Sequence, residues 1–218
     1  MEPSFWHKKW ENNEIGFHEG RPNSLLVKHF SALELPRNSR IFLPLCGKTE
    51  DLRWLMSQGH RAVGVELNES AVESLFEGMS LRPEVTFSEG FKHYSSENLE
   101  VFVGDVFGLS GPRLGKVDAV YDRAALVALP QRVRVNYTAH LKRITSTAPQ
   151  LLVTFHYPQE EMEGPPFPIT SAEVSHHYGR VYRIEHLESK PVDGRLKGRV
   201  EASEEVRMLL PMRPGLSS

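Results

Sequence analysis

Short apolar runs recur along the chain, and the stretches between them space their apolar residues every three or four positions. An apolar run of about four to eight residues without polar alternation is typical of a strand buried on both faces of a parallel sheet. Alternation of such strands with helices predicts an α/β fold with right-handed crossovers. We therefore expect buried strands within residues 40–45, 61–66, 99–105, 117–122 and 150–157.

Helical spacing fills the segments between these runs, and polar residues mark where the helices begin. We expect Ser24, Thr49 and Asn68 to cap the first three helices, because their side-chain oxygens can accept hydrogen bonds from free amide groups. Gly59 is predicted to end the second helix, and Pro130 suits the first position of the fourth. The expected helices lie within residues 25–35, 50–58, 69–79 and 131–145.

The carboxyl-terminal part departs from this alternation. A short helix is predicted over residues 171–179, and two strands without a helix between them are predicted at 180–190 and 204–212. Strands joined in this way can pair as an antiparallel hairpin, which we expect at one end of the sheet. Residues 84–97 allow either a small hairpin or a loop, and the proline-rich, acidic segment 158–170 suits a lid loop.

The composition narrows the class of protein. A chain of 218 residues with 39% hydrophobic and 25% charged residues is expected to form a single globular domain. The net charge of -2 and the pI near 6.6 argue against a general affinity for nucleic acid or anionic membranes. Apolar runs stay below the roughly 20 residues that cross a bilayer, and the first residues lack a secretory pattern. The single cysteine cannot form an internal disulfide, so we expect a cytoplasmic protein.

Residues 1–24 carry more large apolar side chains than a flexible leader usually does. Phe5, Trp6, Trp10 and Phe17 all fall within this segment. We therefore expect the segment to pack on the rest of the domain. It either covers part of the core or closes over a bound ligand, and the pattern alone is compatible with both.

The turn after the first strand, in RIFLPLCGKTEDL, is the place where many α/β proteins bind a nucleotide. A dinucleotide site has several glycines there, because the pyrophosphate must approach the backbone at the start of a helix. This turn has only Gly47, and the side chains of Pro44, Leu45 and Cys46 crowd that approach. A nucleoside without phosphates does not need the space. The turn therefore favours S-adenosylmethionine over NAD.

Acidic residues follow two other predicted strands. Glu66 lies about twenty residues beyond the first turn, the separation at which a carboxylate binds ribose hydroxyls. It could equally complement the dipole of the helix that follows it. Asp105 ends another strand. Because the carboxyl ends of parallel strands meet at one edge of a sheet, the second acidic residue strengthens the ligand interpretation.

Several motifs together resemble one family. They are FWHKKWENNEIGFHEGRPN, FLPLCGKTEDLRWL, GHRAVGVE, YDRAALVALP and GPPFPI, and the similarity extends from Trp6 to Leu210. These stretches are similar to thiopurine S-methyltransferases, above all to bacterial members, which are associated with tellurium and selenium detoxification. The resemblance implies one Rossmann-like S-adenosylmethionine methyltransferase domain over residues 1–218. Its sheet would be mostly parallel, with seven strands, a final antiparallel strand and helices on both faces.

The resemblance also implies an activity and the residues that carry it. Methyl would pass from S-adenosylmethionine to the sulfur of aromatic and heterocyclic thiols such as thiopurines, in a monomer, with selenium and tellurium compounds left open as further substrates. Arg123 would lie beside cofactor and substrate as the catalytic residue, because a guanidinium stays charged and favours an anionic thiol. Phe17 would line the substrate side, together with a second arginine before the last strand, which is Arg195 or Arg199 because the similarity there does not distinguish them. The implied cofactor contacts are Trp10, Leu45, Glu66, Asp105, Val106 and Arg123.

Other chemistry receives less support from the sequence. Cys46 could be a nucleophile, but it has no identifiable histidine partner, and buried structural cysteine is commoner. The 10 histidines show no zinc-like pairing, so no metal site is expected. Without the resemblance, a surface ion pair would be the simpler role for Arg123, and core packing the simpler role for Trp10. Two other functions stay open at this point: a non-catalytic sensor of the adenosyl ligand, and an NAD-dependent oxidoreductase.

Overall fold

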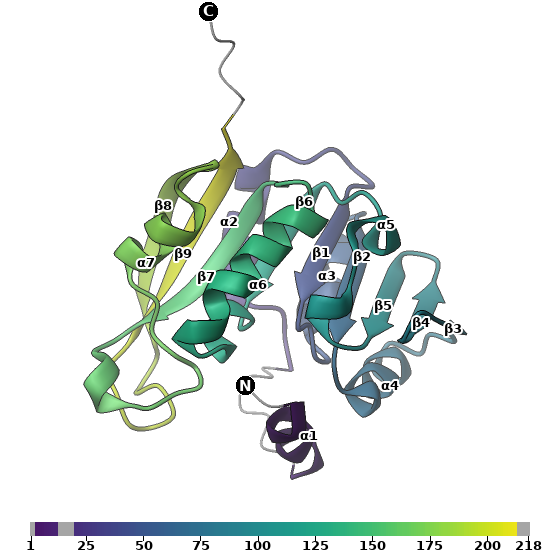
Figure 1. The fold of residues 1–218 in the computed structure, drawn as a ribbon, viewed down its shortest axis with the longest axis horizontal. Helices are drawn as coiled ribbons and strands as arrows, with labels where there is room; N and C mark the ends of the chain where they lie inside the picture. The colour runs from purple at the N-terminus through teal and green to yellow at the C-terminus, as the bar shows by residue number, and fades with distance from the viewer. Residues whose placement is uncertain (1–2, 13–19, 213–218) are drawn as a thin grey trace, which may run out of the picture.

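The predicted strands assemble into one sheet, as Figure 1 shows. The computed structural model describes residues 3–12 and 20–212, and within them nine strands lie in the order β3-β4-β5-β2-β1-β6-β7-β9-β8. The strands are β1 (Arg40–Pro44), β2 (Arg61–Glu66), β3 (Glu84–Ser88), β4 (Phe91–Ser96), β5 (Leu99–Val103), β6 (Ala119–Arg123), β7 (Gln150–His156), β8 (Tyr182–Pro191) and β9 (Ser203–Pro211). The α-helices are α1 (Pro3–Glu11), α2 (Ser24–His29), α3 (Glu50–Ser57), α4 (Glu69–Gly78), α5 (Gly111–Leu114), α6 (Gln131–Ile144) and α7 (Ser171–Tyr178). Short 3-10 helices are η1 (Phe30–Leu33), η2 (Val106–Gly108), η3 (Leu126–Ala128) and η4 (Gln159–Glu161).

The centre of the sheet is parallel, as the alternation of strands and helices predicts. Strands β5, β2, β1, β6 and β7 all run in one direction. The last strand, β9, pairs antiparallel with both β7 and β8, so the expected antiparallel ending is confirmed. The expected number of seven strands is wrong for the described residues, because β3 and β4 form a hairpin that extends the sheet beyond β5.

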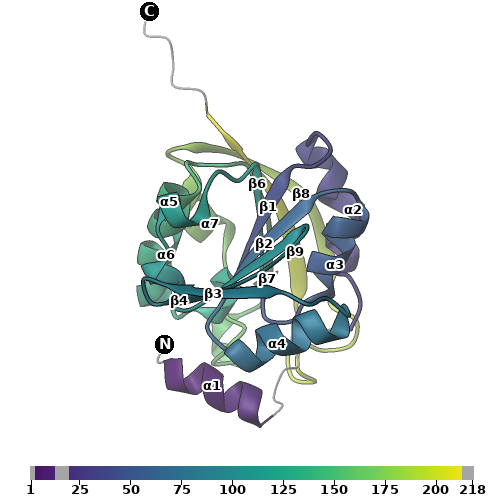
Figure 2. The same cartoon turned by 90° about the vertical axis from the view of Figure 1, so that its right-hand side faces the viewer.

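Helices cover both faces of the sheet, and Figure 2 shows α5, α6 and α7 on one side and α2, α3 and α4 on the other. Alternate residues of each strand point to opposite faces, so β1 contributes Ile41 and Leu43 to one core cluster and Phe42 to the other. Helices α2, α3 and α4 pack in the first cluster, and α6 and α7 pack in the second. The uninterrupted apolar runs are thus explained by burial on both sides.

Capping side chains begin the helices close to the predicted places. Thr49 accepts a hydrogen bond from the amide of Asp51, and Asn68 accepts one from the amide of Ala71. The prediction for α2 is wrong by one residue: Asn23, not Ser24, is the cap, and its side chain accepts from the amides of Leu25 and Leu26. Pro130 likewise lies one residue before α6, at its cap position, and not inside its first turn.

The proline-rich segment 158–170 follows β7 and packs against the loop between β8 and β9. Tyr157, Met162, Leu196 and Val200 form a small apolar cluster between the two. The phenol of Tyr157 donates to the carbonyl of Pro166, and the amide of Phe167 donates to the carbonyl of Val127 across the turn after β6. These contacts anchor the segment beside the carboxyl ends of β6 and β7.

Candidate functional site

Four neighbouring strands end at the same edge of the sheet, and each end carries a residue singled out by sequence. The strand order places β5, β2, β1 and β6 side by side. Glu66 ends β2 and Arg123 ends β6, while Leu45 directly follows β1 and Asp105 lies two residues beyond β5. In open α/β sheets this edge is where ligands bind. The structure therefore brings four of the predicted site positions together.

The turn after β1 has an unusual backbone. Leu45 has φ of 49° and Gly47 has φ of 53°, so both adopt the left-handed conformation. A left-handed residue with a Cβ is uncommon, and such residues cluster at functional sites because the surrounding structure must impose the conformation. The amide of Cys46 donates to the carbonyl of Val65, which ties this turn to β2.

Glu66 joins the two loops that follow β1 and β2. Its side chain is 7% exposed, and its two carboxylate oxygens accept from the amides of Gly47 at 2.8 Å and Asn68 at 2.9 Å. An ionised carboxylate offers about four acceptor positions, and hydroxyls are among the donors that such a group binds. The bond to the amide of Asn68, the cap of α4, also places the carboxylate at the start of that helix, so the helix-dipole interpretation stays open.

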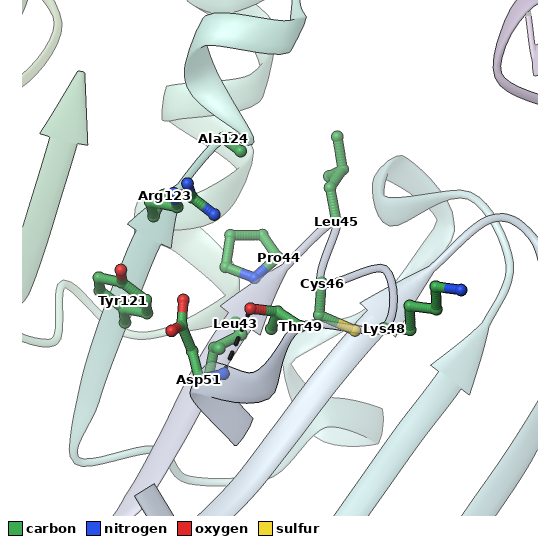
Figure 3. Close-up of a pocket in the computed structure, with 10 residues that line it drawn as sticks. All are labelled: Leu43, Pro44, Leu45, Cys46, Lys48, Thr49, Asp51, Tyr121, Arg123 and Ala124. Carbon is green, nitrogen blue, oxygen red and sulfur yellow. Dashed lines mark hydrogen bonds between the residues drawn. The ribbon is translucent and has the colours of Figure 1, made fainter. Parts of the chain in front are cut away.

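A small pocket lies between the turn after β1 and the end of β6 (Figure 3). Arg123 is half-buried there, and Tyr121 points the same way because alternate residues of β6 share a face. Ala124, which follows Arg123, has φ of 68° and is the second left-handed residue with a Cβ at this site. The pocket is lined by Leu43, Pro44, Leu45, Cys46, Lys48, Thr49, Asp51, Tyr121, Arg123 and Ala124.

Asp51 is a site residue that sequence reasoning missed. It is 1% exposed, lines the pocket, and accepts a hydrogen bond from the amide of Asn23 at 2.7 Å. In Figure 3 its carboxylate points toward the space between Tyr121 and Pro44, whereas Lys48 extends away from that space. In the sequence Asp51 reads as an ordinary acidic residue in the first turn of a helix, so only its packing against Asn23 marks it.

Asp105 and Val106 lie at the end of the sheet edge beyond β5. Asp105 is exposed and accepts from the amide of Phe107 at 3.0 Å, while Val106 is buried. The exposed carboxylate faces solvent on the same edge as Glu66, since β5 pairs with β2. Both predicted cofactor contacts are therefore at this edge.

The other predicted site residues lie farther from the pocket lining. Trp10 is half-buried on α1, which lies beyond the carboxyl ends of the strands in both views (Figures 1 and 2). Phe17 lies outside the described residues. Arg195 and Arg199 are exposed on the loop between β8 and β9, and neither lines the pocket. Their contact with substrate stays a prediction.

Two alternative chemistries can be weighed from the geometry. Burial, and next the charge of Glu66, raise the pKa of the Cys46 thiol well above its ordinary value, so the thiol stays protonated and is a poor nucleophile. Residues 3–12 and 20–212 contain no group of three His, Cys, Asp or Glu side chains that could hold a metal ion. Within the same described residues, none of the helices combines the length and apolarity needed to span a bilayer.

Comparison with known proteins decides the family. The family model described as thiopurine S-methyltransferase matches residues 1–209. The chain belongs to the thiopurine S-methyltransferase family. The thiopurine S-methyltransferase of Xanthobacter autotrophicus is 48% identical over 210 residues, which cover 96% of this chain and 99% of that protein. The thiopurine S-methyltransferase of Teredinibacter turnerae is 48% identical over 206 residues, covering 94% of this chain and 96% of that protein.

A solved structure supports the fold. The 1,6-didemethyltoxoflavin-N1-methyltransferase of Burkholderia thailandensis, crystallised with S-adenosylhomocysteine, superposes with a TM-score of 0.63 at 14% identity, covering 95% of this chain and 87% of that chain. The fold is therefore the Rossmann-like S-adenosylmethionine methyltransferase fold that the motifs implied. As a member of the thiopurine S-methyltransferase family, the protein is an enzyme that uses S-adenosylmethionine to methylate its substrate. This sets aside the oxidoreductase and the non-catalytic sensor.

The residues at the sheet edge suit this methyl donor. Pro44, Leu45 and Cys46 leave no glycine cradle for a diphosphate, and the Glu66 carboxylate at the neighbouring strand end is the kind of acceptor that binds ribose hydroxyls. The pocket beside Arg123 has a volume of about 40 Å³, far below the hundreds of Å³ of an ordinary ligand site. This pocket alone is therefore too small for a nucleoside, and a nucleoside contact with Glu66 and Asp105 stays a prediction.

Proposed function

We propose that this enzyme methylates the sulfur of aromatic and heterocyclic thiols, thiopurines among them, and that selenium and tellurium compounds are further acceptors. The observation that carries the proposal is the Arg123 side chain in a pocket whose other walls include Pro44, Leu45 and Tyr121. Apolar and aromatic walls suit a flat heterocycle, and a guanidinium suits the thiolate attached to it. The names of the relatives in the family support the same substrate class.

The chain's own contribution to the reaction is alignment, exclusion of water and an anionic acceptor. When bound, S-adenosylmethionine supplies an electrophilic methyl group on a positively charged sulfur. Holding two reactants in line can lower a barrier by about 7–11 kcal/mol in favourable systems. We propose that Arg123 stabilises the thiolate form of the acceptor, because a cation beside a thiol lowers the thiol pKa and a guanidinium stays protonated. A thiol that ionises readily then needs no general base.

We also propose that residues 1–24 cover the cofactor site, with Trp10 on the cofactor and Phe17 on the substrate side. Two observations support this role. Helix α1 lies beyond the carboxyl ends of the strands in Figures 1 and 2. The amide of Asn23, where the segment joins α2, donates to Asp51 in the pocket lining. A cover at this place would keep water from the reacting sulfur atoms.

The enzyme is proposed to act as a monomer in the cytoplasm on a small molecule, without a nucleic acid or membrane partner. The net charge of -2 gives no general attraction to polyanions. The lone cysteine is buried as a thiol, as expected in a reducing compartment. The second substrate arginine is assigned to Arg195, with Arg199 as the alternative, because both lie on the loop that packs beside the end of β7.

A methyl-acceptor screen tests the proposal. Purified enzyme is incubated with S-adenosylmethionine carrying a labelled methyl group and with matched thiols, selenols, phenols and amines of the same ring systems. We expect label on sulfur and selenium, and little on oxygen or nitrogen. Transfer confined to oxygen or nitrogen, or no transfer to any thiol, would contradict the proposed substrate class.

The variant Arg123→Lys tests the role of the guanidinium in the same screen. Lysine keeps the charge but loses the planar donors, so we expect kcat/KM for thiols to fall about 10- to 100-fold. Arg132→Lys is the matched control, since Arg132 is exposed on the first turn of α6 and does not line the pocket. Equal activity of the two variants would remove Arg123 from the mechanism.

A further inference from the structure

The turn that carries Arg123 has a backbone that needs support. Strand β6 ends at Arg123, Ala124 is left-handed with φ of 68°, and the chain then enters η3 at Leu126. A residue with a Cβ seldom holds this conformation unless its surroundings impose it. Ala125 and Leu126 are both fully buried, so the supporting contacts lie inside the protein.

Asp122 provides such contacts from the opposite face of β6. It is 0% exposed, and its carboxylate accepts from the amide of Leu126 at 3.1 Å and from the phenol of Tyr137 at 2.8 Å. Successive residues of a strand point to opposite faces, so Asp122 faces α6 while Arg123 faces the pocket. The carboxylate thereby links the turn directly to α6.

This carboxylate is buried without a cationic partner in the part of the chain that the structure describes. The titratable groups that face it are Tyr137 from α6 and Tyr178 from α7, with Arg123 next to it in the chain. Burial, and next the charge of Asp122, raise the pKa of both phenols well above the ordinary value, so both stay neutral. Burial raises the pKa of Asp122 to about 6, against the opposing effect of bonds from Tyr137 and from the amides of Leu126 and Ala125. An unpaired buried carboxylate is costly, so its presence behind this turn calls for a role.

We propose that Asp122, through its bonds to the Leu126 amide and the Tyr137 phenol, is a positioning residue that directs Arg123 into the pocket for methyl transfer. The inference rests on the proposed function, because it takes Arg123 as the group that holds the thiolate. The ionised carboxylate accepts both hydrogen bonds. A neutral carboxyl is a weaker acceptor, and its own proton displaces one of the two donors.

The sign of the pH dependence follows from these bonds. Above a pH of about 6 Asp122 is ionised and the turn is held; below it the carboxyl is protonated and the turn loosens. We therefore expect kcat/KM for thiols to fall as the pH falls through about 6. Tyr137→Phe removes a donor that stabilises the ionised form, so protonation should occur at higher pH in this variant.

The test compares Tyr137→Phe with Tyr182→Phe. Each change removes one buried phenol hydroxyl from the same core cluster, but Tyr182 donates to the carbonyl of Ala148, away from the turn. In Tyr137→Phe we expect the acid limb of the kcat/KM profile to move up by about one pH unit, which is about fivefold less activity at pH 6 and about tenfold less well below it. At pH 8.5 its activity should recover to within about twofold of wild type. Tyr182→Phe should keep the wild-type profile, and coincidence of the two variants' profiles would overturn the inference.

The amide NMR signal of Leu126 gives a readout that does not depend on activity. In the full-length protein without ligand we expect this signal to titrate with Asp122, to shift its midpoint upward in Tyr137→Phe, and to lose the transition in Asp122→Asn. If these shifts occur but no thiol is methylated by the wild type, the proposed function fails while the link between Asp122 and the turn stands. A Leu126 signal that titrates identically in wild type and Tyr137→Phe would overturn the inference whatever the activity.

Discussion

Glu66 shows at the scale of one residue how the fold and the ligand site share a side chain. Its carboxylate holds the amides of Gly47 and Asn68, so the loops after β1 and β2 both depend on it. The sequence predicts a ribose contact or a helix-end charge, but not these bonds. They arise because the left-handed turn at Leu45 directs the Gly47 amide, 19 positions before Glu66, toward the carboxylate.

Glu66→Ala is expected to weaken binding of S-adenosylmethionine by about 1–3 kcal/mol, because buried amide and hydroxyl donors lose their acceptor. Isothermal titration calorimetry measures this directly. Glu69→Ala is the matched control: Glu69 lies in the first turn of α4, where its carboxylate accepts from Lys92 and Tyr94. The affinity of the Glu69→Ala variant for S-adenosylmethionine should stay within about twofold of wild type. Equal losses in the two variants would mean that Glu66 acts only as a charge near a helix end.

At the scale of elements, the site is built where helices begin after parallel strands. Helix α3 starts directly after the turn that holds Leu45, and both its cap Thr49 and its first-turn residue Asp51 line the pocket. The cap of this helix therefore also shapes the site. Because Asp51 accepts from Asn23, the start of α3 further anchors the start of α2.

Thr49→Ala is expected to lower the free energy of unfolding by about 1 kcal/mol, because the amide of Asp51 loses its acceptor at the start of α3. Unfolding in urea, followed by circular dichroism, measures the change. Thr49→Ser keeps the hydroxyl and should retain most of the stability. If the alanine and serine variants unfold at the same urea concentration, the cap does not stabilise this helix.

At the scale of the whole molecule, the sequence predicts the architecture well where burial is strong. The central strands β1, β2, β5, β6 and β7 are buried on both faces, so their apolar runs are continuous and easily recognised. The antiparallel ending follows from two strands with no helix between them. The capping residues of α3 and α4 were predictable because their side chains act locally on the next few amides.

The features that escaped prediction depend on long-range packing. Strand β3 is exposed along its whole length, so it has no pattern of buried positions, and the choice between hairpin and loop could not be made. Asp51 and Asp122 are recognisable only from partners on other elements, namely the amide of Asn23, 28 positions away, and the phenol of Tyr137, 15 positions away. The loop between β8 and β9 carries two exposed arginines, Arg195 and Arg199, so burial does not distinguish them as substrate contacts.

The central claim is that the adjoining ends of β5, β2, β1 and β6 form the site in which cofactor and thiol meet. A crystal structure of the enzyme with S-adenosylhomocysteine and a heterocyclic thiol tests it most directly. We predict the ribose hydroxyls on the carboxylate of Glu66, the nucleoside between Leu45 and Asp105, and the thiol sulfur beside Arg123. Ligands bound elsewhere, with no contact to these residues, would contradict the account.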